Sequence, residues 1–382
     1  MPEVGILTGK VYNKGGKVKT GSPVVSEETD PRARRAKVTV LYNGVNASGQ
    51  LDEYLSSFRY TDIASGSSDS VSLEINDPDR KWIGPWFPEK GDKLAPTIET
   101  INWDKSPQWQ GFNCGLFRVD DFSFRGGPIR LSLEAVALPA DSDFKSAEVT
   151  QTYEQTTLQE IGDIIAGRAG ISLVFEAQDV SIEKIEQNKQ TDCDFYNTLI
   201  KKYGLALKIF NDKLVVFSEA DYEGKKPKAK LTEEDFEPGW SWDTQTTGTY
   251  TGVNYSYSNT TKNKTFTVTA GEEGRILTVN DAADSLEEAM VIALAAVNNA
   301  NKAITTMKIT LKARMMDFIA SDCVEIQKLG RLSGKYYIEQ IEHSIGSGYK
   351  MSLSLRKVEP RITGVISATI GPAEKKKKKG GA

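Results

Sequence analysis

Two groups of acidic residues are the first candidates for chemistry in this sequence: Asp120-Asp121 and the run Glu233, Glu234 and Asp235. Two carboxyl groups that face each other across a cleft can act as the acid and the base or nucleophile of a glycoside hydrolase. Adjacent residues of one strand point to opposite faces of the sheet, so Asp120 and Asp121 cannot form such a pair between themselves. We therefore interpret both groups as structural.

Two further motifs resemble functional sites. The segment Gly330-Arg-Leu-Ser-Gly334-Lys335-Tyr336 resembles a phosphate-binding loop, but it has three residues between its glycines and Tyr in place of Ser or Thr. His343 is the only histidine, which excludes a zinc centre built from several histidines and disfavours a Ser-His-Asp triad. It aligns with Phe124, and we interpret it as a packed or rim residue. The sequence thus predicts a protein that is not an enzyme, with no metal site and no cofactor.

The cysteines and the chain start indicate a cellular compartment. Cys114, Cys193 and Cys323 are far apart and form no C-x-x-C pair, which indicates buried or free thiols in a reducing environment. The start Met1-Pro2-Glu3-Val4 lacks the basic and apolar regions of a signal peptide. The longest apolar stretch, 289–297, is about half of what a bilayer crossing requires. We expect synthesis in the cytoplasm and no membrane insertion.

The charge balance indicates how the protein meets nucleic acid. The 48 Lys and Arg against 52 Asp and Glu give a net charge of −4, and five of the cations are the consecutive lysines 375–379. Without those five the net charge is −9, so the body of the protein is acidic. Tight contact with phosphates requires clustered cations, so this balance favours a surface past which DNA slides without adhering.

The 382 residues are enough for two or three domains of roughly 100–200 residues each. An N-terminal arm, 1–35, precedes short alternating strands and turn residues without helical patterns in 36–140, which predict a first β-barrel domain. Residues 224–360 hold a charged linker and a second set of strands, interrupted by one helix at 284–301. A C-terminal tail, 361–382, follows.

The residues between the two β regions, 141–223, have a different pattern. A capping box at Thr157-Leu-Gln-Glu160 begins one helical stripe, and Asp194 is the expected cap of a second. A hairpin that turns at Asn211-Asp212 follows. The pattern predicts a small α+β module.

Two hairpins, one in each β region, share a pattern. The alternation of apolar residues shifts its parity at Asp120-Asp121 within 115–133 and at Glu339-Gln340 within 334–353. Such a shift inside one strand is what a β-bulge produces. Both hairpins then turn at glycines and return as clean alternations, and the upstream strands Val71-x-Leu73-x-Ile75 and Met307-x-Ile309-x-Leu311 also match. We therefore predict that residues 30–140 and 240–360 hold the same barrel twice.

This order of barrel, insert and barrel resembles the late control D family of phage proteins, the baseplate hubs of contractile tails and related injection machines. The stretch Gln190-Thr-Asp-Cys-Asp-Phe-Tyr-Asn-Thr-Leu-Ile-Lys-Lys-Tyr-Gly204 carries the likeness, with an aspartate-rich helix start followed by Tyr-Gly and a hairpin. The resemblance covers residues 35–360. It implies an α+β, mainly β fold in which two related β-barrel domains flank a small α+β module.

The resemblance also implies a function: a structural hub in a virion or tail-like particle. The expected partners are two further copies of the chain, a spike protein and a tail tube or distal tail protein, with tape measure and baseplate wedge proteins also implied. Three copies of a duplicated chain present six similar surfaces to a hexameric tube and stay threefold toward the spike. DNA is expected only in transit through the channel, and an acidic lumen would repel it. A glycan-degrading or carbohydrate-binding tail-tip protein remains the alternative.

Two groups of residues are candidate interfaces. Trp82, Trp86, Trp103 and Trp109 share one loop-rich insertion that the second β region lacks. They form either a lid on their own barrel or a binding surface, because tryptophan is enriched among residues that dominate binding energy.

The second candidate is the β-like run 362–370 of the tail, with Ile362, Val365 and Ile366, which is expected to add a strand to the spike. The lysine run after it is a solvated end, a clasp on an acidic partner or an artificial addition.

Overall fold

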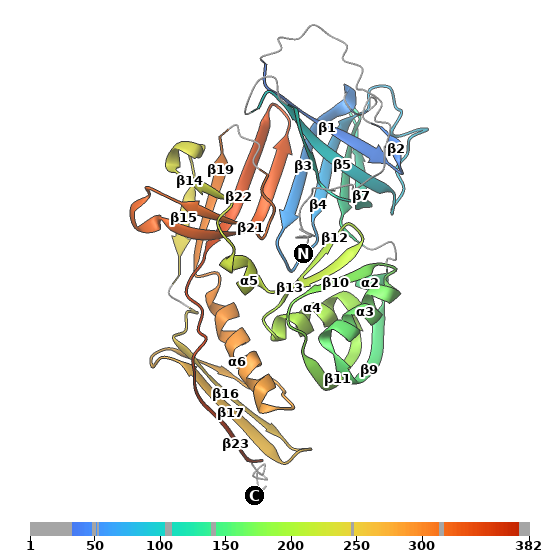
Figure 1. The fold of residues 1–382 in the computed structure, drawn as a ribbon. Helices are drawn as coiled ribbons and strands as arrows, with labels where there is room; N and C mark the ends of the chain where they lie inside the picture. The colour runs from blue at the N-terminus through green and yellow to red at the C-terminus, as the bar shows by residue number, and fades with distance from the viewer. Residues whose placement is uncertain are drawn as a thin grey trace, which may run out of the picture.

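The computed structural model describes residues 33–47, 51, 53–103, 109–138, 143–245, 248–312 and 317–373. In these residues the strands form four sheets, and the predicted class, α+β and mainly β, is confirmed. Figure 1 shows an elongated molecule with the large sheet at one end and two smaller units, each with helices, at the other.

The first β region supplies short strands whose alternate residues are buried. In β4, for example, Val71, Leu73 and Ile75 face the core while the residues between them are partly exposed, as a half-buried sheet requires. The strands are β1 (Arg35–Tyr42), β2 (Val45–Asn46), β3 (Leu55–Ile63), β4 (Ser70–Asn76), β5 (Lys93–Ile101), β6 (Trp109–Asn113), β7 (Phe117–Arg125) and β8 (Arg130–Val136).

The second β region repeats this arrangement. Strands β19, β22 and β21 pair in the same antiparallel order as β4, β8 and β7. Its elements are β14 (Ala229–Leu231), the short helix η1 (Glu233–Asp235), β15 (Ser241–Thr244), β19 (Thr305–Leu311), β20 (Cys323–Ile326), the short helix η2 (Gly330–Leu332), β21 (Gly334–Ile345) and β22 (Tyr349–Lys357).

The sequence predicted two β-barrels, and this prediction is wrong, because the two β regions do not form two closed barrels. They join into one open sheet of 14 strands, in which β21 of the second region pairs with β3 of the first. The join forms because β21 is 12 residues long: its first residues pair with β20, and the part after the bulge extends beyond β20 to meet β3. Ordinary antiparallel hydrogen bonding therefore makes the two halves of the chain one body.

The insert module between them has the predicted α+β character. The capping box of α3 is confirmed, with Thr157 Oγ1 accepting from Glu160 N at 3.2 Å, but α4 is capped by Thr191 and not by Asp194. Its elements are α2 (Asp143–Ser146), β9 (Glu148–Thr157), α3 (Leu158–Arg168), β10 (Ser172–Glu176), β11 (Ser181–Thr191), α4 (Asp192–Lys202), β12 (Ala206–Phe210), β13 (Lys213–Phe217) and α5 (Glu219–Gly224).

A four-stranded sheet near the C-terminus corrects the expected layout of residues 224–382. Strands β16 (Gly252–Asn259), β17 (Lys264–Gly271) and β18 (Ile276–Val279) do not join the large sheet, and the tail strand β23 (Val365–Pro372) pairs along β17. The expected helix is α6 (Leu286–Asn301), capped by Ser285, and it packs on this sheet. The strands separate from the large sheet because their apolar face is covered by α6 instead.

Three clusters of buried apolar residues follow from this layout. The largest is shared by both β regions and includes Ala206, Val215 and Phe217 of the insert module. The second is shared by the insert module, α6 and the four-stranded sheet, and a small third one contains Ala64, Ala320, Cys323 and Tyr337. None of the helices in the described part of the chain is long and apolar enough to cross a membrane.

Candidate functional site

The repeated hairpin is the feature that both β regions share at residue level. In β7 the register against β8 shifts between Val119 and Asp121, and in β21 the register against β22 shifts between Ile338 and Gln340. The predicted bulges are therefore confirmed. The acidic pair at Asp120 offers no opposed carboxylates, because Asp120 and Asp121 are both exposed on one strand.

The junction between the β regions buries the only histidine. His343 of β21 lies opposite Tyr60 of β3, and their rings stack with centroids 5.5 Å apart. The Nδ1 atom of His343 is 2.8 Å from the hydroxyl of Tyr349. Burial lowers the pKa of His343 to about 4, against the opposing influence of Asp62. His343 is thus a packed core residue, one of the two placements that the sequence left open.

The insert module is attached to this junction by buried charges that were not predicted from the sequence. The Lys208 ammonium of β12 lies 2.5 Å from Asp62 and 3.1 Å from Asp69, and it donates to the carbonyl of Ile63. Burial, the largest effect, together with the charge of Asp62 raises the pKa of Asp69 to about 7, although Lys208 opposes it. The signal in the sequence was a lysine within the apolar run 205–210.

A second buried cluster holds α5 against the second β region. The guanidinium of Arg356 in β22 is 2.6 Å from Glu223 and 3.3 Å from Glu219, and it lies over the ring of Tyr337. The sequence did not predict these partners of Arg356, because they come from a different module.

The four tryptophans occupy different environments. Trp82 and Trp86 lie between β4 and β5, whereas Trp103 follows β5 and Trp109 begins β6, so they do not share one loop. Trp82 and Trp103 are buried, Trp86 is half-buried and Trp109 is 61% exposed. Trp103 packs on Tyr349 of the second β region at 5.5 Å.

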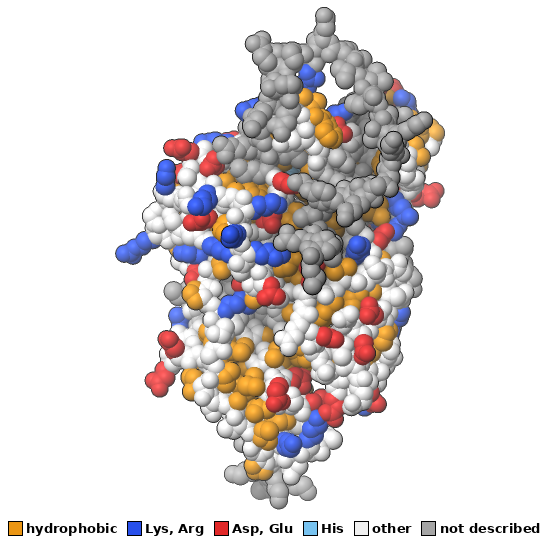
Figure 2. All heavy atoms as spheres, in the orientation of Figure 1, with side chains coloured by type: hydrophobic (Ala, Val, Ile, Leu, Met, Phe, Trp, Pro, Cys, Tyr) orange, Lys and Arg blue, Asp and Glu red, His pale blue; other side chains and the backbone are white. Residues whose placement is uncertain are grey.

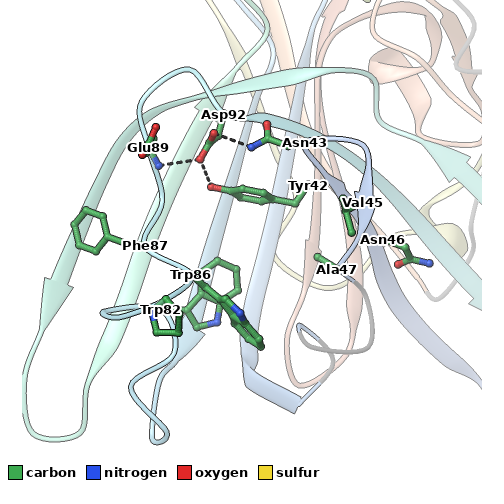
Figure 3. Close-up of a pocket in the computed structure, with 11 residues that line it drawn as sticks. Tyr42, Asn43, Val45, Asn46, Ala47, Trp82, Trp86, Phe87, Glu89 and Asp92 are labelled. Atoms are coloured by element: carbon green, nitrogen blue, oxygen red, sulfur yellow. Dashed lines mark hydrogen bonds between the residues drawn. The ribbon is translucent and has the colours of Figure 1, made fainter.

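A cavity of about 580 Å³ opens beside Trp82 and Trp86 (Figure 3). Its opposite side is polar: the carboxylate of Asp92 accepts from the hydroxyl of Tyr42 at 2.5 Å and from Asn43 Nδ2 at 2.8 Å. Burial alone raises the pKa of Asp92, but these hydrogen bonds outweigh it and hold the pKa below its usual value. The result is a hollow with an aromatic wall and an anionic rim.

The three candidate residues of the tail, Ile362, Val365 and Ile366, also occupy different environments. Ile362 precedes β23 and is tied to α6, because its N–H donates to Asn298 Oδ1 and its carbonyl accepts from Asn298 Nδ2, both at 2.9 Å. Val365 and Ile366 lie in β23, and Ile366 is 67% exposed. Figure 2 shows hydrophobic side chains on the surface of the lower part of the molecule, where α6 and the four-stranded sheet lie.

Among the described residues, no group of three or more His, Cys, Asp and Glu side chains is placed to hold a metal ion.

The chain resembles known tail proteins in sequence and in fold. No protein-family model matches it. It is 25% identical over 233 residues to the "Probable baseplate hub protein" of Escherichia phage P2, a match that spans 58% of this chain and 56% of that protein.

Solved structures of other tail proteins have a similar fold, and two of them illustrate it. The tail protein from Neisseria meningitidis MC58 superposes with a TM-score of 0.64 at 13% identity, covering 84% of this chain and 96% of that one. The 43 kDa tail protein of prophage MuSo2 from Shewanella oneidensis gives 0.63 at 14% identity, covering 85% and 98%. The resemblance to phage baseplate hub proteins is therefore confirmed.

Proposed function

We propose, from this resemblance to phage baseplate hub proteins, that the chain is the structural hub of a phage tail or tail-like particle. In this proposal three copies form a ring of six β regions that joins the tail tube to the central spike. The hub has no enzymatic activity, and it is assembled in the cytoplasm of the bacterial host before it becomes part of the particle.

The repeated bulged hairpin is the observation that carries this proposal. Because each chain holds two β regions with the same strand order, three chains present six similar surfaces. Such a ring matches a sixfold tube on one side and a threefold spike on the other. A chain with a single β region has no comparable way to reconcile the two symmetries.

The partners follow from the same geometry. The large sheet would contact the tail tube or a distal tail protein, and the four-stranded sheet with the exposed Ile366 of β23 would contact the spike. Tape measure and baseplate wedge proteins are further expected neighbours. DNA passes through the channel without stable binding, in agreement with the net charge of −9 outside the lysine run 375–379.

The test is the mass and symmetry of the assembled protein. We expect light scattering to give the mass of three 42.1 kDa chains, for the protein alone or after mixing with its spike, and electron microscopy to show a ring with six similar lobes. A protein that stays monomeric with its spike present, and that binds or cuts cell-wall glycan, would overturn the proposal in favour of a tail-tip enzyme or carbohydrate-binding protein.

A further inference from the structure

The two hairpins define which residues of the two β regions are equivalent. Leu353 of β22 lies opposite Ile341 of β21, and Leu133 of β8 lies opposite Phe122 of β7, each pair shortly after the bulge. Phe122 is therefore the counterpart of Ile341. Two residues further along, and on the same face of each strand, Phe124 is the counterpart of His343.

The strands on the other side of each region correspond in the same way. Tyr60 of β3 lies opposite Val71 of β4, and Trp242 of β15 lies opposite Met307 of β19. Val71 lies opposite Ala135 of β8, which in turn lies opposite Val119, the last residue before the bulge of β7. Met307 lies opposite Leu355 of β22, which lies opposite Ile338, the last residue before the bulge of β21. Val71 and Met307 are therefore equivalent. Trp242 is therefore the counterpart of Tyr60.

The junction within the chain uses only one of the two possible pairings. It joins β21 to β3, with His343 opposite Tyr60. The counterparts of these strands, residues 121–125 of β7 and strand β15, each have a paired neighbour on one side only among the described strands. Each chain therefore carries two complementary open edges that it does not join to each other.

We propose that residues 121–125 of β7 pair antiparallel with β15 of a second copy of this chain, in the register that places Phe124 opposite the partner's Trp242. The same register places Ser123 opposite Asp243 and Arg125 opposite Ser241 of the second copy. The inference rests on the proposed homotrimer for the number of copies, and it identifies the strands and the register that close the ring.

The burial of the counterpart residues supports this pairing. Ile341 and His343 are fully buried at the junction within the chain, whereas Phe122 and Phe124 are only partly buried. Phe87, which is 51% exposed, packs against both phenylalanines at 5.5 and 5.6 Å. These rings form an apolar patch beside an open strand edge, a combination that is found where another chain adds a strand.

The edge of β15 also carries an aromatic ring held in a fixed orientation. Tyr60 is buried and contacts Phe117 of β7 edge-on, with centroids 5.8 Å apart. Its counterpart Trp242 is half-buried, and its indole N–H donates to the hydroxyl of Tyr336 at 3.1 Å. The hydrogen bond orients the Trp242 ring as the Phe117 contact orients Tyr60, so the ring of Phe124 can stack on it as His343 stacks on Tyr60.

Cysteine pairs test the register directly. Residues directly opposite each other in antiparallel strands have Cα atoms about 4.5–5.5 Å apart, within disulfide range, whereas diagonal neighbours are about 7–8 Å apart. In a Cys193→Ser background, the double variant Ser123→Cys/Asp243→Cys is expected to give covalent trimers on oxidation. Both positions are exposed in the single chain, so the substitutions leave its core unchanged.

The chain provides matched controls. The equivalent pair within the chain, Thr61→Cys/Glu342→Cys, should form a disulfide without increasing the covalent mass. The pair Ser123→Cys/Ser241→Cys, two residues out of register, should give at most a tenth of the covalent trimer. An equal mixture of the two single variants at 123 and 243 should give covalent dimers only.

The outcomes separate this inference from the proposed function. A trimer by light scattering that fails to cross-link at 123 and 243, or cross-links equally well out of register, overturns the strand pairing and leaves the hub intact. A chain that is monomeric even with its spike overturns both. Phe124→Glu gives an independent reading: we expect loss of the trimer with a retained cooperative melt, and an unchanged trimer would contradict the pairing.

Discussion

Lys208 and Asp62 form a buried ion pair with 2.5 Å between the ammonium nitrogen and a carboxylate oxygen, although the two residues belong to different modules. The other carboxylate oxygen of Asp62 accepts a hydrogen bond of 2.7 Å from the backbone N–H of Ala320, in the second β region. One side chain thus contacts the insert module and both β regions. Buried pairs of this kind contribute little net stability but strongly disfavour arrangements in which a charge lacks its partner.

Removal of the lysine charge should therefore destabilise the protein. Lys208→Met keeps most of the side-chain volume but leaves Asp62 and Asp69 buried without a cation, and we expect a loss of about 3–5 kcal/mol in the free energy of unfolding. Urea unfolding at neutral pH measures it. The control Lys184→Met removes an exposed lysine paired with Glu154 and should leave the midpoint unchanged. Equal midpoints for both variants would contradict the role of Lys208.

The pKa of His343 predicts how stability depends on pH. Its pKa is about 4 in the folded protein against about 6.5 in an unfolded chain, so the unfolded state binds the proton first. Stability contributed by the neutral ring is complete above about pH 6.5 and is lost as the pH falls toward 4. Asp69, with its raised pKa, titrates with the opposite sign, because its protonation favours the folded state.

The measurement is therefore a difference between two proteins. From pH 7 to pH 5 the wild type should lose about 2 kcal/mol more stability than His343→Phe, a variant that carries the residue type of Phe124. Tyr349→Phe removes the hydrogen bond to His343 but keeps the imidazole, so it should retain the wild-type slope. Identical slopes for the wild type and His343→Phe would show that the histidine does not titrate between these pH values.

The tryptophans should separate into those that support the fold and those that do not. Trp82 is 5% exposed and packs edge-on against Trp86 and Tyr42, so Trp82→Ala should cost about 3–5 kcal/mol and lower the melting temperature. Trp109→Ala, at an exposed ring, should leave the melting temperature unchanged. If Trp82→Ala melts like the wild type but no longer joins its partners, Trp82 belongs to an interface and not to a lid.

The tail strand is best tested by point substitution. Deletion of residues 361–382 would remove β23 from its pairing with β17 and the two hydrogen bonds of Ile362 with Asn298, so it also perturbs the fold. Ile366→Asp changes only an exposed side chain, and we expect binding to the spike to weaken at least tenfold with an unchanged melt. Val45→Asp, at a 70% exposed position on β2, is the matched control. Spike binding that survives Ile366→Asp would exclude this face of β23.

Local signals in the sequence predicted the parts of the fold that depend on neighbouring residues. The parity shift at Asp120 and Glu339 identified both bulges, and the pair Asn211-Asp212 identified a tight turn, where both residues adopt the left-handed conformation. The sequence did not predict which strands pair when they lie far apart along the chain. An alternating pattern indicates which face of a strand is buried but not which edge it joins, so the pairings of β21 with β3 and of β23 with β17 could not be predicted.

The candidate residues were likewise predictable only from their neighbours in the sequence. The apolar residues around His343 in β21 suggested a packed or a rim position, and the structure shows that it is packed. The partners of Lys208 and Arg356 were not predictable, since they come from other modules and electrostatic pairing has no period along the chain.

Because β21 and β3 belong to one polypeptide, the kinetics of any assembly built from this chain change. Strands on one polypeptide meet at an effective concentration of the order of millimolar, far above that of separate subunits in a cell. In the proposed ring of six β regions, every second seam is thus completed as each polypeptide folds, and only the alternate seams depend on encounters between molecules. A closed ring then requires three bodies to collide productively instead of six, which favours its formation even from scarce protein.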